Sequence, residues 1–341
     1  MEKQRKLHLE MIRIIAVFLV IFNHTDGFIY YTETTNRLTW LFSLGMAGIC
    51  RIAVPLFFMV SGALLLDREE SVKDLFQKRI VRILAILIAF SLFYYFMDCI
   101  RYGWQNTGMT DFFEKLCTNG IRESLWFLYM YLAMLLTLPF FREMAKHLGD
   151  KLMIYLILLK ILFSVLIPLV NIAFEISVYL DAGFVGDFAF YMLLGYYMEK
   201  KDMSLHEMIN SGILLLGIGG FAVFDMVIMW LFYRWKGSYQ TALLDLFICV
   251  TAPMVWMLVR RIAERIKPGL AKKLLLITGG CVFGIYLLDN FVRWQLLPVY
   301  LFLCEKTVGV LACSVYVMLT FLLGLMYTFV LKKIPLVNRF L

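Results

Sequence analysis

The sequence predicts an all-α fold, a polytopic membrane bundle of about ten transmembrane helices. Hydrophobic residues make up 62% of the 341 residues and charged residues only 17%, against roughly 45–50% and about 25% in ordinary soluble domains. Apolar runs of about 20 residues, enough to cross a hydrocarbon core about 30 Å thick, recur throughout the chain. These two observations exclude a soluble protein. They also leave no stretch for a separate soluble domain, so residues 1–341 are predicted to form one transmembrane domain.

Hydropathy places ten candidate spans, of which the sixth is short for a membrane crossing. In chain order they cover residues 11–31, 40–66, 80–99, 124–141, 152–172, 184–198, 209–233, 239–259, 274–296 and 308–331.

The distribution of Lys and Arg is the third observation. If the amino terminus is cytosolic, 21 of the 33 Lys and Arg residues lie in inward-facing segments, seven face outward and five lie within the spans. This asymmetry follows the positive-inside rule and predicts that both termini are cytosolic. The formal net charge of +8 therefore indicates membrane topology and not nucleic-acid binding, which would gather basic residues on one soluble face.

Cysteine spacing argues against a metal site. The chain has seven cysteines, but none of them forms a CxxC or CxxH pattern, so neither a zinc site nor a disulfide framework is predicted.

Ionisable side chains occur within the predicted spans, where each costs a few kcal/mol even on a lenient insertion scale. Such side chains normally face the interior of a bundle or a water-filled cavity. Any one of them is compatible with a structural ion pair, but the whole set predicts a polar cavity. The set comprises Arg13, His24, Arg51, Arg82, Asp98, Lys160, Asp187, Asp225, Asp245, Asp289 and Arg293.

The first span places three of these polar groups on one helix face. Arg13 and His24 are 11 residues apart, which is three helical turns plus about 20°, or about 16 Å along the axis. Glu10, one turn before Arg13, extends the same stripe. A histidine can accept and return a proton near pH 7, as activation of a hydroxyl nucleophile requires. His24 is therefore a candidate catalytic base, with a buried structural histidine as the alternative.

Residues of two other spans reach a similar depth. Arg51 lies about 16 Å and Asp289 about 10 Å below the outer surface, close to the depth of His24. We expect His24, Asp289 and Arg51 to meet in the outer half of the bundle, where Asp289 would orient the His24 ring. The competing interpretation pairs Asp289 with Arg293, one turn further along its own helix.

The inner end of the third span carries a cluster of basic residues. Arg79 and Arg82 are three positions apart and face the same way, with Lys78 adjacent, so the two guanidinium groups could grip a phosphate. Basic residues at inner helix ends are also ordinary membrane anchors.

The longest outward segment, residues 101–124, contains Trp104 and other aromatic residues. Such rings could stack on a sugar. The alternative is an interfacial helix anchored by aromatic side chains.

Several segments, in order along nearly the whole chain, resemble the integral-membrane acyltransferase family 3. They are the Arg13–His24 pair, the stretch AVPLFFMVSGALLL, the motif RIVR, and then SLWFLYMYLAMLLTLPFF, FYMLLGYYME, FGIYLLDN and IPLVNRFL.

The resemblance implies a bacterial cytoplasmic-membrane enzyme that transfers an acyl group from cytosolic acyl-CoA, with acetyl-CoA the favoured donor. The acceptor would be a hydroxyl or amine on an extracytoplasmic or lipid-linked molecule, with a glycan favoured. By resemblance, His24 is the catalytic histidine and Arg13 its partner, while Arg79 and Arg82 contact acyl-CoA.

Within the matching segments we expect Ser61 and Trp126 to contact substrate, together with Trp104. No metal is expected, and no nucleic-acid partner. An acyl-His24 intermediate is an alternative use of the histidine.

Two positions depart from the family pattern. Asp289 stands where a His is frequent, and Ser124 where a His often precedes Leu-Trp-Phe. The first departure bears on how a proton would be relayed and makes an inactive relative conceivable. A transporter or sensor that uses the same polar cavity is the rival hypothesis, and the cytosolic arginine pair argues against it, since a small-solute carrier has no need of one.

Overall fold

The computed structural model describes residues 5–25, 37–104, 108–180, 187–200, 209–237 and 247–338, and these residues form helices and no strand. The predicted all-helical, polytopic bundle is confirmed. The α-helices are α1 (Leu7–Asn23), α3 (Arg37–Cys50), α4 (Ala53–Leu65), α5 (Val72–Leu75), α6 (Val81–Tyr102), α7 (Met109–Cys117), α8 (Trp126–Lys146), α9 (Asp150–Ile161), α10 (Ile167–Phe174), α11 (Asp187–Lys200), α13 (Ser211–Lys236), α14 (Ile248–Arg265), α15 (Leu270–Lys306), α16 (Gly309–Leu331) and α17 (Pro335–Asn338). Short π-helical turns join α5 to α6 and α9 to α10.

Within the described residues, seven helical segments are long and apolar enough to cross a membrane. They are Thr39–Leu65, Val72–Tyr102, Glu123–Lys146, Asp150–Phe174, Ser211–Lys236, Leu270–Lys306 and Gly309–Leu331. The other three predicted spans fall on α1, α11 and α14, which have 17, 14 and 18 residues. Parts of those three predicted spans lie outside the described residues, so ten crossings remain a prediction.

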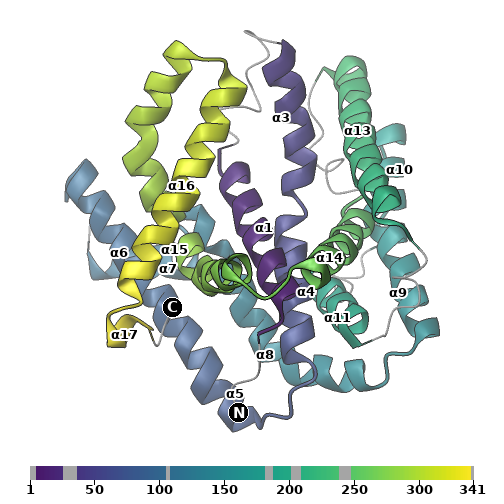
Figure 1. The fold of residues 1–341 in the computed structure, drawn as a ribbon, viewed down its shortest axis with the longest axis horizontal. Coiled ribbons are helices and arrows are strands. Elements are labelled where there is room, and N and C mark those ends of the chain that lie inside the picture. Colours follow the sequence, from purple (N-terminus) through teal and green to yellow (C-terminus); the bar gives the residue numbers. More distant parts are fainter. Residues whose placement is uncertain are drawn as a thin grey trace.

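Helix α1 lies near the centre of the bundle (Figure 1). It packs against α15 and α16 on one side and against α3, α4 and α14 on the other. Accordingly, its apolar residues Ile12, Ala16, Val17 and Ile21 are fully buried. A central α1 can present its few polar residues to the interior of the protein and not to lipid.

The predicted second span is interrupted in its middle. Helix α3 ends at Cys50 and α4 begins at Ala53, with a turn at Arg51 and Ile52. Pro55 explains the interruption, because proline has no N–H and its ring clashes with the carbonyl group four residues earlier, here that of Arg51. Hydropathy alone merges the two helices, because both are apolar.

Several predicted spans are longer in the structure, and two of them differ most. Helix α15 continues from the predicted end at residue 296 to Lys306, and the third span begins at Val72 and not at residue 80. Hydropathy detects the apolar centre of a helix, while the polar ends can project beyond the hydrocarbon core.

Helices α4 and α11 make the closest backbone contact that bears on the site. A Cβ atom on Gly62 would lie 1.9 Å from the carbonyl oxygen of Met192, and one on Gly195 would lie 2.1 Å from that of Met59. The two glycines thus allow each helix to rest directly on the backbone of the other, as small residues do in membrane helix pairs. This contact fixes α4, whose residues line the cavities described below.

We predict that Gly62→Ala or Gly195→Ala forces α4 and α11 apart and destabilises the protein by about 1–3 kcal/mol. Melting in detergent, followed by intrinsic fluorescence, measures the effect. Gly219→Ala in α13 is the matched control, since nothing lies within 4 Å of a Cβ built there. Equal melting temperatures for all three variants would contradict the predicted role of the contact.

Candidate functional site

Two cavities lie inside the bundle. The first, which we call the His24 cavity, has a volume of about 430 Å³ and contains His24, Arg51 and Lys160 in its lining. The second, which we call the arginine cavity, has a volume of about 460 Å³. Its charged lining residues are Arg13, Arg68, Glu70, Lys78, Arg79 and Arg82. These residues belong to the side that the charge distribution predicts to be cytosolic.

His24 is held by a chain of hydrogen bonds that joins α1 to α15. Its Nδ1 lies 2.5 Å from Oδ2 of Asp289, a carboxylate only 1% exposed. Arg293 donates from Nε to the other oxygen of Asp289 at 2.9 Å, and from a terminal nitrogen to the main-chain carbonyl of His24 at 2.8 Å. Asp289 therefore contacts both His24 and Arg293, the two partners that the sequence left as alternatives.

This geometry defines which ring nitrogen is available for chemistry. An ionised carboxylate only accepts hydrogen bonds, so the proton between His24 and Asp289 belongs to Nδ1. In the neutral ring Nε2 then carries the lone pair. Among the described residues, Nε2 has no hydrogen-bond partner. His24 can accept a proton at Nε2 while Asp289 stabilises the resulting imidazolium.

Two cations share the His24 cavity with the histidine. Arg51 stands at the helix interruption caused by Pro55, and Lys160 of α9 is buried with its ammonium 5.5 Å from the ring centre of Tyr191. Positive groups in a cavity screened from water stabilise negative charge that develops on a reacting oxygen. The cavity therefore combines a base with electrophilic partners.

The arginine cavity is organised by Glu70. Its carboxylate accepts hydrogen bonds from Nε of Arg79 at 2.9 Å and from Arg142 at 3.1 Å. Burial raises the pKa of the Glu70 carboxyl, but the hydrogen bonds and charges of Arg79 and Arg142 outweigh burial and hold that pKa below its ordinary value. Glu70 is thus anionic near neutral pH and keeps the Arg79 side chain at the cavity wall.

Helix α1 contributes to both cavities. Arg13 lines the arginine cavity and is paired with Glu10, a buried residue, at 3.1 Å. His24, at the other end of α1, lines the His24 cavity. The polar stripe predicted on the first helix therefore reaches from one cavity to the other.

Three aromatic side chains separate the cavities. Phe57, Phe127 and Tyr286 line both of them. The ring centres of Phe57 and Phe127 are 5.6 Å apart, as are those of Phe127 and Tyr286, which is contact distance for aromatic rings. We call these three residues the aromatic partition.

Most of the residues selected from the sequence lie at one of the cavities. The His24 cavity contains His24, Arg51 and Trp126, and the arginine cavity contains Arg13, Ser61, Lys78, Arg79 and Arg82. Glu10 and Asp289 stand behind Arg13 and His24 as their partners.

Other predicted residues lie away from the cavities. Trp104 lines neither and contacts Phe96, with ring centres 6.0 Å apart. Its segment contains a short helix, α7, and the anchoring of this helix at the membrane interface stays a prediction. Asp98 pairs with Arg122, and Asp225 is buried against Gly48 of α3. Asp245 and the side chain of Asp187 lie outside the described residues.

Sequence reasoning did not select Glu70 or the aromatic partition, and it gave Lys160 no individual role. Lys160 was visible as a charge within a span, but the sequence offered no partner for it. Glu70 lies in a short loop between spans, where acidic residues are unremarkable. Aromatic residues form 16% of the chain, so nothing distinguishes Phe57, Phe127 and Tyr286 from residues that simply fill the core.

Fold and site together define a polytopic helical membrane protein with a histidine–carboxylate pair in one cavity and an arginine cluster in an adjoining one. The chain belongs to acyltransferase family 3: a family model described as an acyltransferase domain matches residues 7–331, nearly the whole chain. It is therefore a membrane acyltransferase. No curated protein and no solved structure gives a significant match.

We predict that His24→Ala lowers the rate of acyl transfer by at least about 10²-fold, the usual contribution of a general base. Asp289→Asn should also lower the rate, because an amide can donate to Nδ1 and favour the wrong tautomer. Transfer to a soluble hydroxyl acceptor measures both effects. His147→Ala is the control, because His147 lies at the end of α8 and lines neither cavity. Normal turnover by a folded His24→Ala protein would contradict a catalytic role.

Proposed function

We propose that the protein transfers an acyl group, with acetyl favoured, from acyl-CoA in the arginine cavity to a hydroxyl or amine in the His24 cavity. The observation that carries this proposal is the arrangement of two cavities of unlike chemistry on either side of the aromatic partition. One cavity is rich in cations and suits a polyanionic donor. The other holds His24, the only histidine among the described residues that line either cavity, and it suits the acceptor.

The donor side is supported by its charge. Among the described residues, five cationic side chains, those of Arg13, Arg68, Lys78, Arg79 and Arg82, line the arginine cavity with a single carboxylate, that of Glu70. Guanidinium groups bind phosphates through paired hydrogen bonds. Coenzyme A carries several phosphate charges at one end and its thioester at the other, so its phosphates can remain among these residues while the acyl group approaches the partition.

The acceptor side is supported by its aromatic and polar lining. Trp126 and Tyr191 line the His24 cavity, and the Trp126 side chain remains partly exposed. Aromatic ring faces beside hydrogen-bonding groups suit a sugar, which agrees with an extracytoplasmic or lipid-linked glycan as acceptor. Ser61 lines the opposite cavity, and we assign it to the donor side.

The proposed reaction is a direct transfer of the acyl group from the thioester to the acceptor. The acceptor oxygen attacks the thioester carbonyl while Nε2 of His24 removes its proton, so that a carbon–oxygen bond forms. Arg51 and Lys160 stabilise the negative charge that develops on the carbonyl oxygen. The carbon–sulfur bond then breaks, and the proton on His24 passes to the departing thiolate, which leaves as coenzyme A.

We place the protein in the cytoplasmic membrane of a bacterium with the arginine cavity facing the cytosol. The excess of Lys and Arg on that side supports this orientation. It also places the donor cavity in the compartment that supplies acyl-CoA.

We predict that acetyl-CoA raises the melting temperature of the purified protein, since a ligand at 100 times its Kd stabilises the folded state by about 2.7 kcal/mol. Arg82→Gln should require about tenfold more acetyl-CoA for the same shift, the consequence of losing a charge-assisted hydrogen bond. Lys306→Gln is the control, because Lys306 is a cation that lines neither cavity. Absence of any shift in the wild type, together with solute uptake into proteoliposomes, would favour the transporter hypothesis.

We predict that Phe127→Ala widens the passage through the aromatic partition and raises the rate with butanoyl-CoA relative to acetyl-CoA. Phe127 contacts both other members of the partition, so its truncation opens the passage most directly. The ratio of kcat/KM for the two donors is the measurement.

Phe18→Ala is the control for this ratio. Phe18 of α1 packs against Phe22 and Phe321 and lines neither cavity. The same ratio in wild type, Phe127→Ala and Phe18→Ala would show that the partition does not limit the donor.

A further inference from the structure

A third pocket lies behind the His24 site and has no part in the proposed transfer. Its volume is about 240 Å³. It is formed by the end of α6, by Arg122 just before α8, by the middle of α15 and by Tyr316 of α16. We call it the Arg101 pocket. It shares no lining residue with the His24 cavity or the arginine cavity.

The Arg101 pocket contains three guanidinium groups. Arg101, Arg122 and Arg293 line it, and among the described residues Asp98 provides the one carboxylate of the lining. Asp98 pairs with Arg122, and the buried Asp289 pairs with Arg293 from behind. Arg101 has no ion pair among the described residues, and its guanidinium carbon lies 5.3 Å from the ring centre of Trp294. The pocket therefore keeps a positive charge after its internal pairs are formed.

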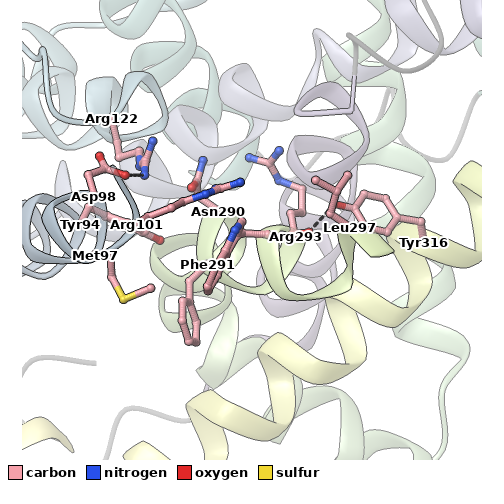
Figure 2. A pocket seen from close by; sticks show the side chains of 11 residues that line it. Tyr94, Met97, Asp98, Arg101, Arg122, Asn290, Phe291, Arg293, Leu297 and Tyr316 are labelled. Carbon is pink, nitrogen blue, oxygen red and sulfur yellow. Dashed lines mark hydrogen bonds and ion pairs between the residues drawn. The ribbon is translucent and has the colours of Figure 1, made fainter. Parts of the chain in front are cut away.

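One of the arginines that line this pocket has a hydrogen-bond donor without an acceptor. Nε of Arg122 is buried and has no hydrogen-bond partner in the described structure. In Figure 2, Arg101 and Arg122 extend from one side and Arg293 stands on the other, with Asn290 between them. Stacking on Trp294 limits the freedom of Arg101, so little further ordering is needed when it binds an anion. A buried donor without an acceptor destabilises the folded protein. A ligand that accepts its hydrogen bond removes this cost.

We propose that the Arg101 pocket binds an oxyanion, a phosphate or carboxylate group, at a site distinct from both cavities of the transfer reaction. The guanidinium groups of Arg101 and Arg122 hold the anionic oxygens, and Asn290 adds a neutral donor. Phe291, Trp294 and Tyr94 provide a wall for the carbon part of the ligand. The same chemistry fits the headgroup of an anionic phospholipid and a free anion.

The site is coupled to His24 through Arg293. This residue lines the pocket, donates to Asp289 and donates to the carbonyl of His24. An anion bound in the pocket interacts with Arg293, which is also the partner of Asp289. Binding of the anion therefore changes the electrostatic environment of the hydrogen bonds that position the His24 ring.

Binding to purified protein tests the site. Wild type, Arg101→Gln and Lys115→Gln are prepared in a maltoside detergent free of phospholipid, at constant ionic strength. One arm titrates inorganic phosphate by equilibrium dialysis, and the other titrates a soluble short-chain phosphatidylglycerol. Lys115 is the matched control, because it is a cation of the same outward region, residues 101–124. It pairs with Asp111 and lines no part of the pocket.

The expected result is saturable binding of at least one probe, with affinity reduced about tenfold in Arg101→Gln and unchanged in Lys115→Gln. Tighter binding of phosphatidylglycerol identifies a lipid headgroup, and binding of phosphate alone identifies a free anion. The arginine cavity is present in all three proteins, so only the difference between the two variants reports the Arg101 pocket. Should Arg101→Gln fail to fold, Asn290→Ala replaces it, with a smaller loss of affinity expected. Equal affinity in pocket and control variants, or no saturable binding of either probe, would overturn the proposal.

Discussion

The structure depends on a negative charge buried within a membrane bundle. A carboxylate at membrane depth is costly unless it is paired and hydrogen-bonded. Asp289 meets this requirement with two partners, since it accepts from His24 of α1 and from Arg293 of its own helix, α15. Because Arg293 also binds the His24 carbonyl, the buried charge holds the end of α1 by its main chain as well as by its side chain. The position of the His24 ring and the packing of α1 on α15 therefore rest on the same few hydrogen bonds.

The rarity of charged residues in membrane spans explains which parts of the site could be predicted from the sequence. Charged residues seldom occur within membrane spans, so each one is conspicuous, and counting residues along a helix gives its depth. In this way the sequence predicts that His24, Asp289 and Arg51 meet in the outer half of the bundle, with Arg13 about 16 Å from His24 on the same helix face. The competing pairings of Asp289 could not be separated by depth, because His24 and Arg293 both lie within its reach. In the structure Asp289 uses one oxygen for each.

Other parts of the site could not be predicted, since they depend on tertiary packing. Any of the 30 phenylalanines could fill the core, and only the packed structure shows that Phe57 and Phe127 separate two cavities. Glu70 acquires its role from Arg142, which lies 72 positions away in the sequence. The interruption at Arg51 was visible as Pro55, but the surrounding hydropathy is uniform, so the predicted span continued through it.

Helix α1 fixes the relation between the two chemical ends of the site. Arg13 lies within α1 and His24 is the residue that directly follows its last turn, so their separation is set mainly by the rise of the helix backbone and not by side-chain motion. In the proposed reaction, the helix thus fixes the distance between the phosphates of the donor and His24. Inserting or deleting one residue between them would rotate His24 by about 100° around the helix axis. For that reason, the site tolerates substitutions along this segment but does not tolerate changes in its length.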